Sequence, residues 1–194
     1  MSYVVLSDNF VQKFSVPAWT RTLILITTGS WIIAGLAQFA INLPFTPVPI
    51  TGQTLGVLFV ATTLGAKKGI GSVATYILQG VMGLPFFAEG NAGIQVLYGP
   101  TAGYLAGFLI ASYVIGLAAE KNKDRKFKTA FPSFLIGYII IFTCGITWLS
   151  QFVGFTNAVS QGLLPFIPGE IIKLVILSIA LPTAWSNLHS EVSK

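Results

Sequence analysis

The chain has 194 residues, of which 54% are hydrophobic and only 9% are charged, and its formal net charge is +5. A soluble domain carries about 25% charged residues, so this composition excludes an ordinary soluble enzyme or binding module. The apolar residues come in blocks and do not alternate, which predicts membrane-spanning helices and argues against a membrane β-barrel.

The chain begins MSYVVLSDNFVQKFSVPAWT, which lacks the basic start, apolar core and cleavage site of a signal peptide. Six apolar blocks follow, each near the length of about 20 residues that crosses a bilayer. They predict an all-α integral membrane protein that forms a single domain over residues 1–194, with spans at approximately 22–41, 52–66, 69–87, 101–119, 130–153 and 167–188. Six spans would place both termini on the same side of the membrane.

The basic residues show which side this is. The connections 42–51, 88–100 and 154–166 contain no Lys or Arg. Cytoplasmic loops are enriched in these residues, so both termini are predicted to be cytoplasmic. A short basic loop between two spans is what topology requires, and it does not by itself indicate nucleic-acid binding. Ten of the 11 basic residues fall on the cytoplasmic side of this topology: Lys13, Arg21, Lys67, Lys68, Lys121, Lys123, Arg125, Lys126, Lys128 and Lys194.

Small residues recur at a spacing of four within the predicted spans. In the fourth span, Gly103, Gly107 and Ala111 form a face that lets two helices approach closely. Ser30 and Ala34 form a looser version in the first span. Such faces most often pack helices together inside a bundle.

The three external connections are apolar and poor in charge. They read NLPFTPVPITGQT, FFAEGNAGIQVLYGPTAGY and GFTNAVSQGLLPFIPG. Irregular backbone is tolerated at membrane depth where it lines a protected cavity. These connections are therefore either lids that cap a substrate cavity or turns that lie in the interfacial region.

The eleventh basic residue, Lys173, lies with Glu170 inside the last predicted span. The two residues are i and i+3 on a helix, so they share one face. Either charge alone at the bilayer centre would cost at least about 2.5–3.5 kcal/mol. The pair either neutralises itself near the interface or faces a cavity and binds a polar ligand. Ionisable residues inside a membrane usually mark functional sites, which favours the second interpretation.

Other polar and aromatic side chains are weaker candidates. Gln53 and Asn91 lie at or beside the external connections, whereas Gln79 lies within a span, where amides more often bond between helices. Tyr104 and Trp148 are aromatic residues that suit the wall of a ligand site. A single histidine and a single cysteine give no metal-site spacing. The chain also has no Walker-type phosphate loop and no Ser–His–Asp set, so no catalytic residue is predicted.

Three stretches together resemble the BioY family, the biotin-specific substrate-binding (S) components of energy-coupling factor (ECF) transporters. They are PVPITGQTLGVLF from Pro47, YILQGVMGLPFFAEGNAG from Tyr76 running into GPTAGYLAGF from Gly99, and PGEIIK from Pro168. The resemblance implies a six-helix protein of the bacterial cytoplasmic membrane that captures biotin from outside without a cofactor. Its expected partners are membrane lipids, a transmembrane coupling protein and two cytoplasmic ATPases, with no nucleic acid.

The resemblance also suggests roles for single residues. Family members usually carry Asp where this chain has Glu170, and many have Gly at Asn91 and an apolar residue at Gln79. Ser30 and Ala34 are the nearest match to the small-residue face on which S components dock the coupling protein. The expected substrate-binding residues are Glu170, Lys173, Asn91, Gln53, Gln79, Tyr104 and Trp148.

Two arrangements of biotin remain open from the sequence. Glu170 either holds the ureido head while Lys173 holds the tail carboxylate, or both residues grip one end. Their Cβ atoms are only about 5–6 Å apart, and biotin is longer than that. The alternatives are an S component for another vitamin, a stand-alone ion-coupled carrier with a proton on Glu170 or Lys173, and an intramembrane enzyme with Glu170 as base. The last alternative lacks a second catalytic group near the external face.

Overall fold

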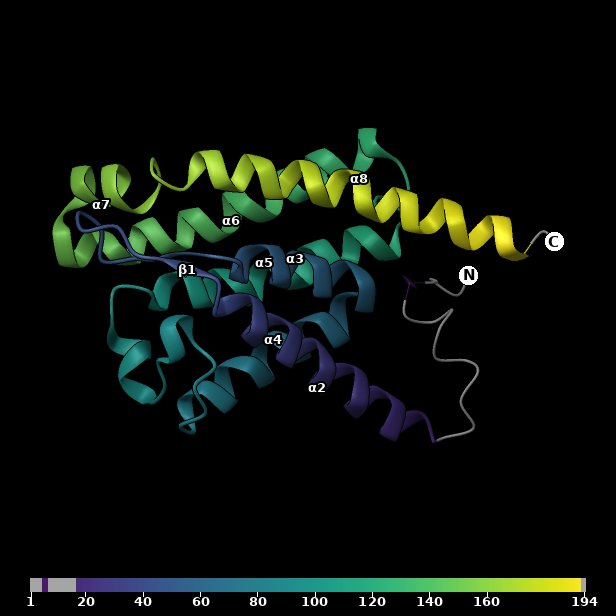
Figure 1. The fold of residues 1–194 in the computed structure, drawn as a ribbon, viewed down its shortest axis with the longest axis horizontal. Helices are drawn as coiled ribbons and strands as arrows, with labels where there is room; N and C mark the ends of the chain where they lie inside the picture. Colours follow the sequence, from purple (N-terminus) through teal and green to yellow (C-terminus); the bar gives the residue numbers. More distant parts are fainter. Residues whose placement is uncertain (1–4, 7–16, 193–194) are drawn as a thin grey trace.

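The computed structural model of the chain describes residues 5–6 and 17–192. Most of the N-terminal stretch that is predicted not to be a signal peptide lies outside the described residues, as do Lys13 and Lys194. The described part is mostly helical, and most of its helices run roughly along the long axis of the molecule (Figure 1).

A helix overlaps each of the six predicted spans. These helices are α2 (Ala18–Ala37), α3 (Gln53–Leu64), α4 (Ala66–Val81), α5 (Ala102–Glu120), α6 (Phe127–Val153) and α8 (Ile167–Val192). Within the described residues, α2, α5, α6 and α8 are long and apolar enough to cross a membrane, and α3 is a shorter apolar helix. Helix α4 ends well before the predicted residue 87, because Gly83 takes a φ of 106° and Pro85 follows it.

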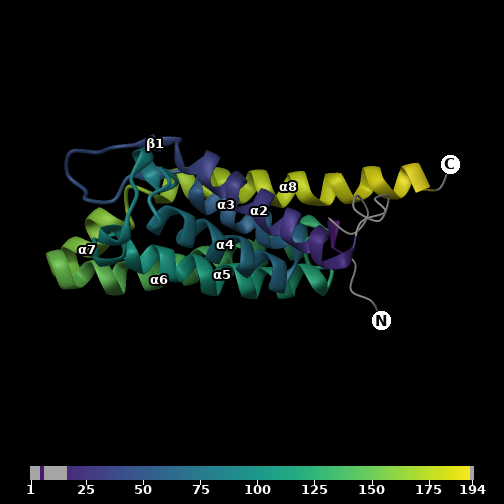
Figure 2. The same ribbon diagram turned by 90° about the horizontal axis from the view of Figure 1, so that it is seen from below.

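The connections predicted to be external have local structure that the sequence did not reveal. Strands β1 (Ala40–Ile41) and β2 (Ile50–Thr51) pair as a short antiparallel ladder. The second connection contains the 3-10 turns η1 (Ala88–Gly90) and η2 (Ile94–Tyr98), and the third contains helix α7 (Phe155–Gly162). These segments gather at one end of the molecule, away from the α5–α6 connection, in two perpendicular views (Figures 1 and 2).

The predicted small-residue face of α5 packs against α6. A Cβ atom on Gly103 would lie 2.2 Å from the Cβ of Trp148, and one on Gly107 would lie 2.9 Å from the Cα of Ile141. Ala111 on the same face is fully buried. Side chains larger than hydrogen at the two glycines would push the helices apart, so the small residues set the close approach.

A second close approach joins α5 to the start of α4. A Cβ on Gly116 would lie 2.4 Å from both the N and the Cα of Ala66. One turn further along α5, the Glu120 carboxylate accepts a hydrogen bond of 2.9 Å from the Ala66 amide. Glu120 thereby caps the N-terminus of α4, where a negative charge is favoured.

Candidate functional site

A cavity of about 340 Å³ lies between α3, α5, α6 and α8 and the connections predicted to be external. Much of its wall is apolar and aromatic, with Phe87, Phe108, Phe142 and Phe166 among the lining residues. Its polar lining residues are Asn42, Thr46, Thr51, Gln53, Thr54, Glu89, Asn91, Gln95, Thr101, Tyr104 and Glu170. A volume of this size and a mostly apolar wall are typical of small-molecule sites.

Local sequence explains why polar groups meet at the inner part of this cavity. Helix α8 begins at Ile167, and Pro168 is tolerated in its first turn because the first N–H groups of a helix have no partner within the helix. Glu170 therefore lies in the first turn, where the helix dipole favours a negative charge. Helix α3 starts after Gly52, at which a Cβ would lie only 2.5 Å from the Leu36 carbonyl oxygen. The glycine therefore lets the TGQT stretch pass close to α2 and face α8.

Glu170 and Lys173 form an ion pair with two threonines around it. The Lys173 ammonium lies 2.7 Å from Glu170 Oε1, and the Thr54 hydroxyl donates to Glu170 Oε2 at 2.8 Å. Lys173 also donates to the Thr51 carbonyl oxygen at 2.6 Å and to the Thr54 hydroxyl at 3.0 Å. An ammonium has three N–H donors, so all three are used within the protein.

These bonds leave the Glu170 carboxylate at the wall of the cavity. Glu170 lines the cavity although it is only 7% exposed, whereas Lys173 is not among the lining residues. The buried hydroxyl of Tyr138 lies against the same carboxylate and Thr54, but it makes no hydrogen bond of good geometry among the described groups. Lys173 therefore orients Glu170 from behind, and the carboxylate is the charged group that faces the cavity.

Gln53 lies beside this network and is held on both sides. Its amide oxygen accepts from the Thr51 hydroxyl at 3.1 Å, and its amide nitrogen donates to the Tyr76 hydroxyl. The ring of Tyr76 is fully buried and meets Phe87 edge to face. Gln53 thus lines the cavity and also fixes the start of α3 against α4.

The connection between α4 and α5 contributes two amides and a second carboxylate to the cavity lining. Asn91 donates to the Ala88 carbonyl at 2.9 Å and Gln95 donates to the Ala92 carbonyl at 2.6 Å, so each amide stabilises its own turn. Glu89 is exposed and has a φ of 62°. This left-handed conformation costs a residue with a side chain roughly 1–2 kcal/mol.

Tyr104 joins three helices at the cavity wall. Its hydroxyl donates to the Gly162 carbonyl at the end of α7 at 2.8 Å, and its ring meets Phe142 edge to face. A Cβ on Gly145 would lie 2.3 Å from the Tyr104 ring. The tyrosine therefore fills a space that a glycine on α6 leaves open.

The structure brings Glu170, Gln53, Asn91 and Tyr104 together around one cavity, with Lys173 directly behind Glu170. It does not place Gln79 or Trp148 among the lining residues. Gln79 accepts a hydrogen bond of 3.0 Å from Ser30, and Trp148 donates its indole N–H to the Gly99 carbonyl at 2.9 Å. Both residues hold neighbouring segments in place.

The predicted docking face on α2 does not agree with the packing. Ser30 is fully buried and Ala34 is 6% exposed, so both residues lie inside the bundle. Ser30 bonds to Gln79 of α4, and a Cβ on the adjacent Gly29 would lie 2.5 Å from the Ser72 hydroxyl. The small side chains bring α2 against α4, which the spacing alone could not distinguish from a face for another protein.

Sequence reasoning missed Thr54, Tyr138 and the aromatic wall residues Phe142 and Phe166. Thr54 directly follows Gln53, but its contact with Glu170 spans 116 residues of sequence, so no signal for it was present in the sequence. The phenylalanines gave no signal, because an apolar span contains many aromatic residues and only their packing selects those that face a cavity.

The arrangement can bind a ligand but shows no catalytic set. A buried carboxylate that keeps acceptor capacity can receive N–H groups from a ligand, and the aromatic wall can hold its apolar part. Among the described residues, no group of three or more His, Cys, Asp or Glu side chains lies close enough to hold a metal ion.

Known proteins resemble this chain along most of its length. A family model described as the BioY family matches residues 8–190. A biotin transporter BioY from Thermotoga maritima is 42% identical over 156 residues, which are 80% of this chain and 86% of that protein. The biotin transporter BioY2 of Lactococcus lactis is 39% identical over 160 residues, 81% of this chain and 86% of that protein.

A solved structure has the same fold. It is the crystal structure of the S-component for biotin from an ECF-type ABC transporter, with a TM-score of 0.77 and 27% sequence identity. The match covers 89% of this chain and 95% of that chain.

Proposed function

The chain belongs to the BioY family, and we propose that it holds biotin in the cavity above Glu170. It is the biotin-binding S component of an ECF-type transporter, a transport protein and not an enzyme. The observation that carries the proposed site is the buried Glu170 carboxylate, which lines a small aromatic cavity and is oriented by Lys173. No cofactor is needed for this role, because biotin is the cargo.

The proposed topology has six spans with both termini in the cytoplasm. The asymmetric distribution of Lys and Arg supports it, and among the described residues four of the six helices that overlap these spans are long and apolar enough to cross a membrane. In this topology the cavity opens to the outside, and the α5–α6 connection faces the cytoplasm. The chain is a multi-pass membrane protein, and the bacterial origin of the two relatives supports a place in the bacterial plasma membrane.

The geometry favours biotin with its ureido head towards Glu170. The head has two N–H donors, and a carboxylate accepts such bonds strongly. Lys173 already uses its three donors within the protein, so it has none to offer a tail carboxylate. A second carboxylate beside Glu170 would also be repelled. The tail of biotin therefore points towards the outer part of the cavity, near Asn91 and Gln95.

Binding of biotin to the isolated protein tests this function. We expect purified protein in detergent to bind biotin at low concentration without ATP, as measured by equilibrium dialysis with labelled biotin. Competition by other vitamins at equal concentration would indicate an S component for a different vitamin. Uptake into vesicles that contain only this chain, driven by a pH gradient, would instead support a stand-alone carrier.

The proposed partners complete the transporter. We expect a transmembrane coupling protein and two cytoplasmic ATPases, because the described chain has no phosphate loop of its own and an S component supplies only substrate capture. Co-purification of such proteins with the tagged chain from its native membrane tests this expectation.

Glu89 gives a prediction about the outer end of biotin. It is the second carboxylate of the cavity lining, and the tail carboxylate of biotin approaches it in the proposed orientation. We expect Glu89→Gln to bind biotin about twofold more tightly at low salt, because one weak repulsion between exposed charges is removed. The difference should vanish at high salt and for the methyl ester of biotin. Weaker binding by the variant would contradict the proposed orientation of the tail.

A further inference from the structure

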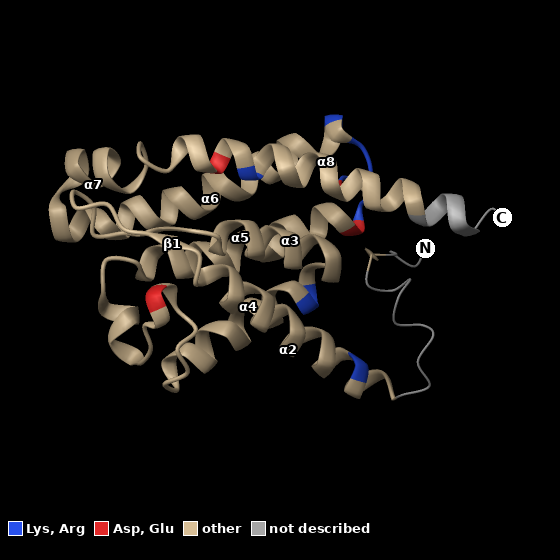
Figure 3. Cartoon of the chain, in the orientation of Figure 1, with Lys and Arg blue, Asp and Glu red and all other residues tan. Residues whose placement is uncertain are grey.

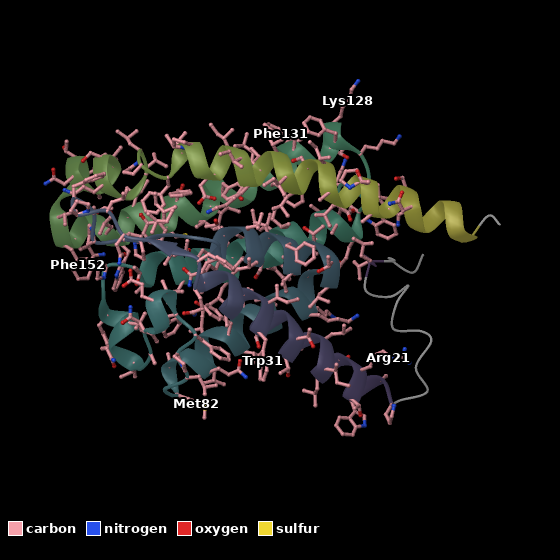
Figure 4. The ribbon with its side chains drawn as sticks, viewed as in Figure 1. Arg21, Trp31, Met82, Lys128, Phe131 and Phe152 are labelled. Carbon is pink, nitrogen blue, oxygen red and sulfur yellow. The ribbon has the colours of Figure 1, made fainter. Side chains whose placement is uncertain are left out.

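A second concave surface lies at the opposite end of the bundle from the biotin cavity. It is a groove of about 490 Å³ between the end of α5 and the start of α6. Lys121, Lys123 and Lys128 line its rim, and no acidic side chain is among its lining residues. Figure 3 shows basic residues at this end of the cartoon, and Figure 4 shows Lys128 with its nitrogen directed away from the bundle.

The positive charge of this rim is not neutralised by its acidic neighbours in the sequence. The stretch EKNKDRK looks mixed in charge, but the structure turns both acids inwards. Glu120 accepts from the Ala66 amide, and Asp124 is 3% exposed and accepts from the Trp185 indole N–H. Burial raises the pKa of the Asp124 carboxyl above its usual value, and the hydrogen bonds from Trp185 and the backbone and the nearby Arg125 only partly offset this rise.

The lysines are held in place by the backbone turn that ends α5. The Lys123 amide donates to the Ala118 carbonyl at 3.0 Å, and the Asn122 amide donates to the Ala119 carbonyl at 2.8 Å. Asn122 has a φ of 60°, so the turn is a Schellman motif with asparagine in the left-handed position. This turn is short and bonded on both sides, and it fixes where Lys121 and Lys123 leave the backbone.

The floor of the groove is apolar. Val114 and Leu117 of α5 and Ile136 of α6 line it, and all three lie within the predicted membrane spans. Thr129 and Ser133 add hydroxyl groups between this floor and the lysine rim. From rim to floor, the groove therefore changes from cationic through polar to apolar, in the order of the phosphate, glycerol and acyl parts of a phospholipid.

We propose that this groove binds one anionic phospholipid from the cytoplasmic leaflet, with its phosphate at the lysine rim and an acyl chain on the apolar floor. Basic pockets between membrane helices on the cytoplasmic side suit anionic head groups. A soluble anion would not use the floor, and a zwitterionic lipid would place its own cation against the lysines. The inference uses the proposed topology but does not depend on the biotin site.

The test compares matched variants by native mass spectrometry of the purified protein in detergent. Dioleoyl phosphatidylglycerol and dioleoyl phosphatidylcholine are offered separately at equal concentration. We expect the unmodified protein to prefer the anionic lipid, and Lys121→Gln with Lys128→Gln to weaken its binding at least about tenfold. The control, Lys67→Gln with Lys126→Gln, removes the same charge from the same membrane side outside the groove and should retain the lipid.

A third variant tests the apolar floor. Ala118→Phe fills the groove and leaves every lysine in place, so it should also lose the lipid. If the groove and control variants lost lipid binding equally, general charge attraction would explain the result and the proposal would be overturned. If Ala118→Phe bound the lipid fully, no acyl chain would lie in the groove. If the groove variant keeps the lipid but no longer co-purifies with ATPase partners, the surface is a protein interface instead. Unchanged biotin affinity in all variants separates this result from the biotin site.

Discussion

Glu170→Gln is expected to weaken biotin binding at least about 100-fold. The carboxylate is the charged acceptor that faces the cavity, and hydrogen bonds to a charged group contribute about 1.5–3 kcal/mol each. An amide presents one acceptor and one N–H₂ group, and this donor would face the ureido N–H groups. Isothermal titration of biotin into the purified variant measures the loss.

The single variant also leaves Lys173 without its ion pair, so a matched double variant is needed. Removing one partner of a buried pair is strongly destabilising, whereas replacing both with uncharged residues of similar size is often neutral. We expect Glu170→Gln with Lys173→Met to keep the melting temperature of the unmodified protein and still fail to bind biotin. A double variant that is well folded and binds biotin with unchanged affinity would remove this pair from the site.

Gly116→Ala is expected to lower the apparent melting temperature in detergent by about 2–12 °C. The new methyl group would lie 2.4 Å from the backbone of Ala66, and backbone atoms cannot move aside as a flexible side chain would. Overpacking of this kind costs typically about 1–3 kcal/mol, occasionally more, and each kcal/mol shifts the melting temperature of a chain of this size by about 2–4 °C.

Gly35→Ala is the control for this change. Gly35 also lies within a helix, but it is exposed and a Cβ there would meet nothing within 4 Å. Because alanine favours a helix over glycine by about 1 kcal/mol, we expect this variant to be at least as stable as the unmodified protein. If both variants behaved alike, the close contact between α5 and the start of α4 would not be important for stability.

The sequence predicted some parts of the site and not others for a physical reason. Charges inside an apolar span can be recognised in the sequence, so Glu170 and Lys173 could be chosen as candidate site residues without the structure. The partners that decide their separate roles come from far along the chain. Thr54 lies 119 residues from Lys173, and only the fold brings them within 3.0 Å. Lys173 consequently changed from a candidate ligand contact to the group that orients Glu170.

Small residues illustrate the same limit. The spacing of Gly103, Gly107 and Ala111 predicted a close helix contact, which the packing of α5 on α6 confirms. The spacing of Ser30 and Ala34 looked equally suitable for another protein, but it is used inside the bundle against α4. Small residues spaced four apart identify a narrow helix face, but this spacing does not show which neighbouring segment packs against that face.

The helical membrane class and the approximate helix positions follow from the amino-acid sequence, because burial in lipid requires long apolar blocks whatever the helices contact. The family could also be recognised from the sequence, through short motifs in and beside the connections predicted to be external. The sequence does not show which polar groups face the cavity or which acids turn inwards at the other end, and these are known only from the fold. Those outcomes depend on hydrogen bonds and close contacts between segments far apart in the chain, and Glu120 on the Ala66 amide is one such bond.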